Sequence, residues 1–240
     1  TVFAGSKAIK AGLEAEHANG HRHIVVDAIR DEDLYEIGKA AKDLRLITGG
    51  SGVALGLPAN FGCIPAPVPW TSQSGQAVVL SGSCSVATRA QVAKHIARHP
   101  SREIVAAEVI NGCLTAVEMA DWLLAQKGIP IAYSSADPEV IRAVQQEFGS
   151  DRSASAIESF MADVARIVVA GGATRIITAG GETSGAVVEG LNLSQLEIGP
   201  EIAPGVPALR AGSGLVLALK SGNFGGEDFF ASAAAVLEGA

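Results

Sequence analysis

Basic residues are in the minority in this sequence. Its 240 residues include 18 Lys and Arg against 25 Asp and Glu, which gives a formal net charge of −7. A nucleic-acid-binding surface normally requires an excess of positive charge, so we expect no nucleic-acid partner. Long hydrophobic runs are also lacking, because glycine or a charged residue interrupts each apolar stretch. We therefore expect no transmembrane helix and no membrane partner, and we see no signal peptide.

Cysteine is scarce, and its three copies form no familiar motif. Cys63, Cys84 and Cys113 are an odd number and include no Cys-x-x-Cys pair. This pattern argues against a disulfide framework and against a cysteine zinc site, and it fits the reducing cytoplasm, where we expect the protein. The histidines also suggest no metal site, and we expect all five to be solvated: His17, His21, His23, His95 and His99.

Two common nucleotide-binding motifs are missing. Nothing in the sequence matches GxxxxGK[ST], so the chain is not a P-loop protein, and the absence of GxGxxG argues against a simple NAD enzyme. Glycine itself is abundant, with 28 copies, and it clusters after short apolar segments. In such places glycine permits tight turns and a close approach of the backbone to a ligand.

Short apolar segments alternate with amphipathic ones along the chain. This alternation predicts an α/β fold with a mainly parallel sheet flanked by helices. The predicted strands are 23–29, 44–48, 77–80, 129–134, 175–179 and 215–220. The predicted helices are 7–18, 31–44, one from about 86 to 95, one that starts at Asp137, 153–169 and a terminal helix after Gly226. Between the last two strands, 196–209 reads as irregular or as a meander.

Prolines gather between Cys63 and Gly75, at positions 65, 67 and 69. Such a stretch predicts a linker or crossover, which we place at 62–75. It separates two α/β patterns, 1–61 and 76–240.

Four glycine-rich turns each follow a predicted strand: Thr48–Gly52, Ser81–Ser85, Ala179–Gly185 and Ser221–Gly226. All but the last lead straight into a predicted helix. The start of a helix presents free N–H groups and the positive end of its dipole, which suit a phosphate. In open α/β sheets ligands bind beyond the carboxyl ends of the strands, where all four turns should lie. Such turns are also common as purely structural features, so alone they do not name a ligand.

Longer strings around these turns resemble the four-carbon acid sugar kinases, a family that includes 3-oxo-tetronate, threonate and erythronate kinases. The strings are LSGSCSVATRAQ (80–91), AGGETSGAV (179–187), ALKSGNFG (218–225), TGGSGVA (48–54) and IGPEIAPGVP (198–207). They extend over most of the chain, while residues 99–113 look less typical of the family.

The resemblance implies a two-domain enzyme that binds a sugar acid in its N-terminal domain and ATP in its C-terminal domain. By this resemblance 1–61 is the C-terminal part of a second α/β domain, which binds the substrate. Residues 62–75 are the linker, and 76–240 is the nucleotide-binding domain. ATP and Mg²⁺ are the implied cofactors, and a homodimer is a reasonable expectation for such an enzyme. The chain starts at Thr1, and we expect a preceding segment that holds the general base.

Site residues follow from the matching strings. The resemblance implies that these residues bind the nucleotide: Ser83, Gly180, Gly181, Glu182, Thr183, Gly222 and Gly225. Glu182 is also the candidate Mg²⁺ ligand through water, with helix capping as the alternative. For Lys220, a phosphate contact competes with simple solvation, which we favour at a strand end.

Candidates on the substrate side are Asp27, Gly49, Gly50 and Ser51, with capping of the next helix as the alternative for Asp27. Together these features favour an ATP-dependent kinase that phosphorylates a four-carbon sugar acid, with this chain supplying mainly the ATP-binding half. Two alternatives remain. One is a non-catalytic nucleotide-binding module, and the other is an oxidoreductase or transferase on a similar α/β scaffold.

Overall fold

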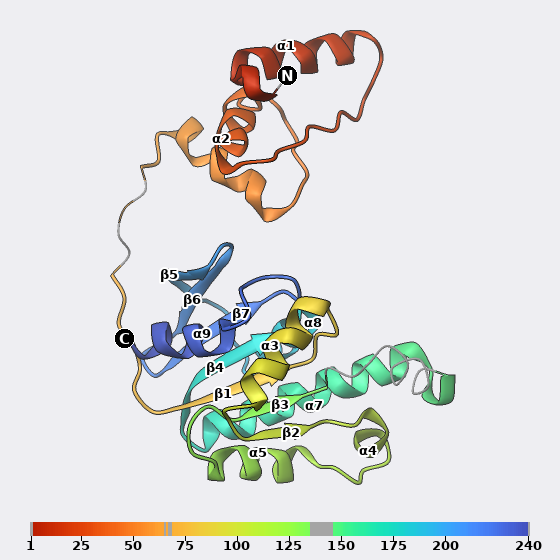
Figure 1. The fold of residues 1–240 in the computed structure, drawn as a ribbon, viewed down its shortest axis with the longest axis vertical. Coiled ribbons are helices and arrows are strands. Elements are labelled where there is room, and N and C mark those ends of the chain that lie inside the picture. Colours follow the sequence, from red (N-terminus) through yellow and green to blue (C-terminus); the bar gives the residue numbers. More distant parts are fainter. Residues whose placement is uncertain (1, 65, 67–68, 135–145, 240) are drawn as a thin grey trace. The chain divides into compact units, whose positions relative to one another are not determined.

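The chain forms two compact units, Thr1–Pro67 and Val68–Ala240 (Figure 1). A computed structural model describes residues 2–64, 66, 69–134 and 146–239. Among the described helices, none combines the length and hydropathy needed to cross a membrane.

A seven-stranded sheet forms the centre of the described part of the larger unit. Its strands are β1 (Gln76–Ser81), β2 (Ser101–Glu103), β3 (Ile131–Tyr133), β4 (Ala173–Ala179), β5 (Glu197–Ala203), β6 (Val206–Ala211) and β7 (Leu215–Lys220). Their order is β2-β3-β1-β4-β7-β6-β5. The first five strands in this spatial order, β2 through β7, are parallel to one another. β6 runs antiparallel to both β7 and β5. The predicted mainly parallel sheet is confirmed.

Helices cover both faces of this sheet (Figure 1). They are α3 (Val86–Ile96), α4 (Ala106–Ile110), α5 (Ala116–Ala125), α7 (Ser150–Ala170), α8 (Gly181–Gly190) and α9 (Phe229–Glu238). Successive β1 residues point to opposite faces, as a strand requires. Val78 and Leu80 belong to a buried cluster with Met161 of α7, whereas Val79 belongs to a second cluster with Phe230 of α9. The sheet is therefore a buried layer between two helical layers.

Most of the predicted elements of this unit are present. Strands predicted at 77–80, 175–179 and 215–220 correspond to β1, β4 and β7, and 196–209 forms the β5–β6 hairpin. The short strand β2 and the helices α4 and α5 were not predicted. β2 has only three residues and is partly exposed, so it carries no apolar pattern. The helix predicted to start at Asp137 lies outside the described residues.

The smaller unit is helical in the part that the structure describes. It contains α1 (Ser6–Ala18), α2 (Asp31–Ala40) and the short 3-10 helices η1 (Val2–Ala4), η2 (Ser51–Gly56) and η3 (Pro58–Phe61). The strands predicted at 23–29 and 44–48 are wrong, because neither segment pairs with another described segment. A strand exists only through its hydrogen-bonded partner.

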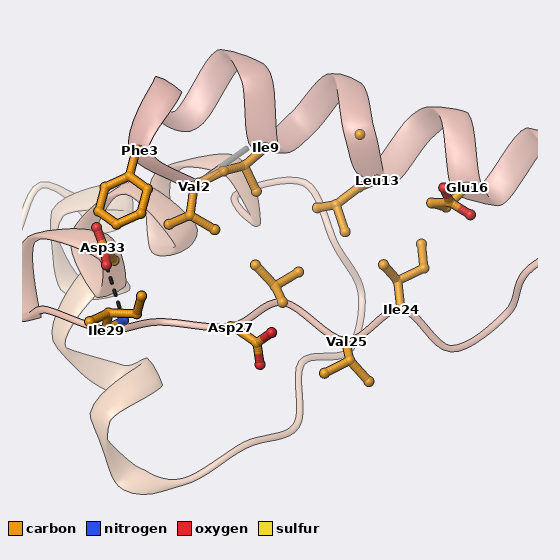
Figure 2. Close-up of a pocket in the computed structure, with 12 residues that line it drawn as sticks. Val2, Phe3, Ile9, Leu13, Glu16, Ile24, Val25, Asp27, Ile29 and Asp33 are labelled. Atoms are coloured by element: carbon orange, nitrogen blue, oxygen red, sulfur yellow. Dashed lines mark hydrogen bonds between the residues drawn. The ribbon is translucent and has the colours of Figure 1, made fainter.

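The apolar pattern of 23–29 is nevertheless real. Ile24 points toward Leu13 of α1, whereas Val25 and Asp27 point away from it (Figure 2). The segment is extended and its side chains alternate, which is the pattern that suggested a strand. Local pattern alone could not show that this segment lacks a pairing partner among the described residues.

Candidate functional site

Three of the four glycine-rich turns meet at one edge of the sheet. β1, β4 and β7 are parallel neighbours, so their carboxyl ends lie side by side. Backbone hydrogen bonds join the turns directly. Gly82 N and Ser83 N donate to Ala179 O at 2.9 and 3.1 Å, and Gly180 N donates to Lys220 O at 2.8 Å. The turns after these three strands therefore form one continuous backbone surface.

Two glycines in this surface leave no room for a side chain. A Cβ atom on Gly82 would collide with Thr183 Oγ1, and a Cβ atom on Gly222 would lie 2.6 Å from Ser83 Oγ. Such a contact is shorter than packed atoms allow, so a side chain at either position would force the hydroxyl of the facing turn to move. Ser83, Thr183 and Gly222, which the sequence placed in three separate turns, are thus neighbours in space.

Helix α3 holds the turn that follows β7. Ser85 caps α3 by accepting from Thr88 N at 3.1 Å, and its hydroxyl donates to Gly222 O at 2.5 Å. Thr88 Oγ1 donates to the same carbonyl oxygen at 2.7 Å. One turn further on, the Gln91 amide donates to Gly225 O at 2.9 Å. The turn is therefore fixed by side chains from another element.

Sequence reasoning missed these three supporting residues. Ser85, Thr88 and Gln91 are spaced three apart, which places them on one face of the helix. Thr88 and Gln91 are buried, at 0% and 1% exposed. Polar residues at this spacing directly after a glycine-rich turn were the signal that could have revealed them.

The start of α8 is open to a ligand. Its N-cap residue is Gly180, which has no side chain to cap the helix, so the N–H groups of the first turn have no side-chain acceptor from that position. Gly181 is exposed, and an added Cβ would meet nothing within 4 Å. Thr183 is buried at 4% exposed. Free N–H groups and the helix dipole make this end suitable for an anion.

Glu182 lies exposed in this first helical turn. Within the described residues its carboxylate forms no hydrogen bond or ion pair, so the capping alternative finds no support here. The described residues also contain no group of three or more His, Cys, Asp or Glu that could hold a metal ion. A single carboxylate still fits Mg²⁺, which commonly uses one or two carboxylates together with phosphate oxygens and water.

The candidates on the substrate side belong to the smaller unit. Gly49, Gly50 and Ser51 are exposed where η2 begins. Asp27 lines an open cavity of about 410 Å³ between α1 and the extended segment 24–29 (Figure 2). Its alternative role as a helix cap is not observed.

Asp33 provides the cap of α2 instead. Its carboxylate accepts from Ile29 N at 3.0 Å and from Arg30 N at 3.1 Å. These hydrogen bonds lower the pKa of Asp33 below its ordinary value, and the bond from Ile29 has the largest effect. Asp27 therefore has no capping role among the described residues, and it is one of the residues that line the cavity.

Two predictions of solvated side chains are wrong. Lys220 is 0% exposed although it ends its strand, because α3 and the following turn cover it. His95 is 5% exposed, since the inner face of α3 packs on α9, where Phe230 meets its ring. Burial lowers the pKa of His95 to about 4. Its Nε2 lies 2.8 Å from Ile129 O, so it donates in the neutral ring.

The fold and the joined turns define a nucleotide-binding α/β domain, and comparison with known proteins agrees. Residues 78–230 match the family model described as "Nucleotide-binding C-terminal domain", and residues 1–57 match "Sugar-binding N-terminal domain". The chain belongs to the four-carbon acid sugar kinase family.

Comparison with individual relatives shows what share of their length this chain spans. A 3-oxo-tetronate kinase of Brucella melitensis is 41% identical over 239 residues, covering 95% of this chain and 55% of the relative. A 3-oxo-tetronate kinase of Pseudomonas fluorescens is 39% identical over 249 residues, covering 100% of this chain and 57% of the relative. A crystal structure of a Haemophilus influenzae protein superposes on this chain with a TM-score of 0.72 at 37% sequence identity. The match covers 98% of this chain and 58% of that protein. The chain spans little more than half the length of these relatives.

Proposed function

We propose that this chain is the ATP-binding half of a kinase that phosphorylates a four-carbon sugar acid. The single observation that supports this proposal best is the joining of three glycine-rich turns beside the open start of α8. The relatives that are 3-oxo-tetronate kinases point to 3-oxo-tetronate as the acid.

In this proposal the phosphates of ATP lie along the turns after β1, β4 and β7. The N–H groups of Gly181 and Glu182 donate to phosphate oxygens, and the hydroxyls of Ser83 and Thr183 add further donors. The bare backbones of Gly180, Gly222 and Gly225 line the same surface. Transfer of a phosphoryl group requires little covalent help from the protein, so positioning and charge neutralisation account for most of the rate.

We propose Glu182 as the residue that holds Mg²⁺ through water. The ion would neutralise charge on the phosphate oxygens, and Glu182 would orient its water shell from the first turn of α8. The exposed position of this carboxylate and its lack of partners within the described residues support the assignment.

The smaller unit is proposed to contribute to the sugar-acid site. In this division 1–61 belongs to the substrate domain, 62–75 is the linker, and 76–240 is the nucleotide domain. Asp27, Gly49, Gly50 and Ser51 remain the proposed substrate-side residues.

A homodimer in the cytoplasm completes the proposal. Cys63, Cys84 and Cys113 are exposed and form no disulfide among the described residues, which fits a reducing compartment. Sedimentation equilibrium would test the dimer.

An ATP-consumption assay tests the proposed activity. The full-length protein that contains this chain is incubated with ATP, Mg²⁺ and, in turn, 3-oxo-tetronate, threonate and erythronate, and ADP formation is followed. We expect ADP to form with one acid and not in its absence. ATP binding without ADP formation for any acid would favour the alternative of a non-catalytic nucleotide-binding module.

A further inference from the structure

Lys220 is an unusual residue for the interior of a protein. It is the last residue of β7, it is 0% exposed, and it is among the largest fully buried side chains of the described residues. Lysine is almost never fully buried without an opposite charge to pair with, because burial removes the hydration of its ammonium group. The partners of Lys220 are therefore informative.

All of its hydrogen-bond partners are neutral. Its Nζ donates to Thr88 Oγ1 at 2.8 Å and to the carbonyl oxygens of Ser221 and Gly222 at 3.1 Å each. The ring of Phe229 lies 5.7 Å from Nζ. These three bonds use all three N–H groups of the ammonium. No carboxylate of the described residues forms an ion pair with it.

The charge of Lys220 is thus left uncompensated within the described structure. Burial lowers its pKa to about 8, and no opposing charge is among the causes. A buried charge without a counter-ion is costly, and a bound anion close by would offset much of that cost. Positive charges also attract an anion more strongly where protein, rather than water, separates them.

The position of the ammonium indicates where such an anion would bind. Gly222 O accepts from Lys220 Nζ and also from Ser85 Oγ and Thr88 Oγ1. Gly222 is itself packed against Ser83, at the junction of the three joined turns. The ammonium therefore lies directly beneath the backbone surface to which the phosphates are assigned.

We propose that Lys220 is a positioning residue for the nucleotide phosphates, which fixes the Gly222 turn against α3 and supplies a buried positive charge that the phosphates neutralise. The proposal rests on the proposed function. Lys220 does not contact the phosphate, because its three N–H groups are already used. It acts through the Gly222 carbonyl and through its charge.

Substitution of Lys220 by methionine tests this role. The variant keeps most of the length of the side chain and removes the ammonium group with its charge and its N–H donors. We expect ATP binding, measured by calorimetry, to weaken by about tenfold or more, since a full charge near the phosphates is lost. Binding of adenosine, measured by ligand-observed NMR, should stay within about twofold, because adenosine has no phosphate for the charge to attract.

Lys94→Met is the matched control. Lys94 undergoes the same chemical change, but it is partly exposed on α3 and paired with Asp228 at 2.8 Å. We expect its ATP affinity to remain that of the wild type. Lys220→Gln is a second variant, which retains an N–H donor without the charge, and it should show the same selective loss of ATP binding as the methionine variant.

The outcomes separate the alternatives. Equal weakening of ATP and adenosine binding would show a merely structural role and overturn the proposal, as would unchanged ATP affinity in folded Lys220→Met. Failure of both variants to fold would also overturn it, because the lysine would then serve the fold. If the wild-type chain itself binds no ATP, the proposed function fails, and this result is distinct from a failure of the lysine alone.

Discussion

Substitution of Gly181 by valine separates binding from folding at the proposed phosphate site. A Cβ atom at Gly181 meets nothing within 4 Å, so the change should alter the free energy of unfolding by no more than about 0.5 kcal/mol. The branched side chain instead fills the open space in front of the first N–H groups of α8. Loss of one charge-assisted hydrogen bond costs about 1.5–3 kcal/mol, which corresponds to roughly 10- to 150-fold weaker ATP binding.

Calorimetric titration with ATP and urea unfolding measure the two effects on the same samples. Gly185→Val is the matched control, because Gly185 also lies in α8 with nothing within 4 Å of its Cβ position. It is one turn beyond the open end of the helix, so its ATP affinity should be unchanged. Unchanged affinity in folded Gly181→Val, or an equal loss in both variants, would refute the assignment of the phosphates to α8.

Three further predictions concern Gly222, Glu182 and His95. Gly222→Ala places a Cβ 2.6 Å from Ser83 Oγ and should cost about 1–3 kcal/mol in urea unfolding, besides weakening ATP binding. Glu182→Gln should weaken ATP binding in calorimetry with Mg²⁺ but not in EDTA, and equal effects in both would contradict the metal assignment. The pKa of His95 is lowered from 6.5 to about 4, so folding favours the neutral ring. The neutral ring of His95 makes its full contribution to the free energy of unfolding above pH 6.5. As pH falls from about 7.5 to 5, the free energy of unfolding should decrease by about 2 kcal/mol, because the unfolded chain takes up the proton first. His95→Gln should remove this dependence from urea-unfolding curves.

The turns of the larger unit could be predicted because their signals are local. An apolar strand, a glycine-rich turn and a helix start are adjacent in sequence after β1 and β4, and parallel strands end at the same edge of a sheet. What the sequence could not show is which strands are neighbours. The approach of Ser83 to Gly222 depends on the order β1-β4-β7, which is set by long-range pairing.

The wrong predictions also concern features that depend on contacts between distant parts of the chain. The segment 23–29 has the alternation of a strand, but pairing is not encoded in one segment, and no described segment pairs with it. Lys220 and His95 carry polar side chains that usually face water. Their burial depends on how α3 and α9 pack on the sheet, and composition does not show that packing.

Calorimetric titration of the chain with ATP, and separately with NAD⁺, tests the central claim most directly. The joined turns beside the open start of α8 predict saturable binding of ATP that NAD⁺ does not match. Saturable NAD⁺ binding with no detectable ATP binding would contradict the assignment of these turns to a kinase.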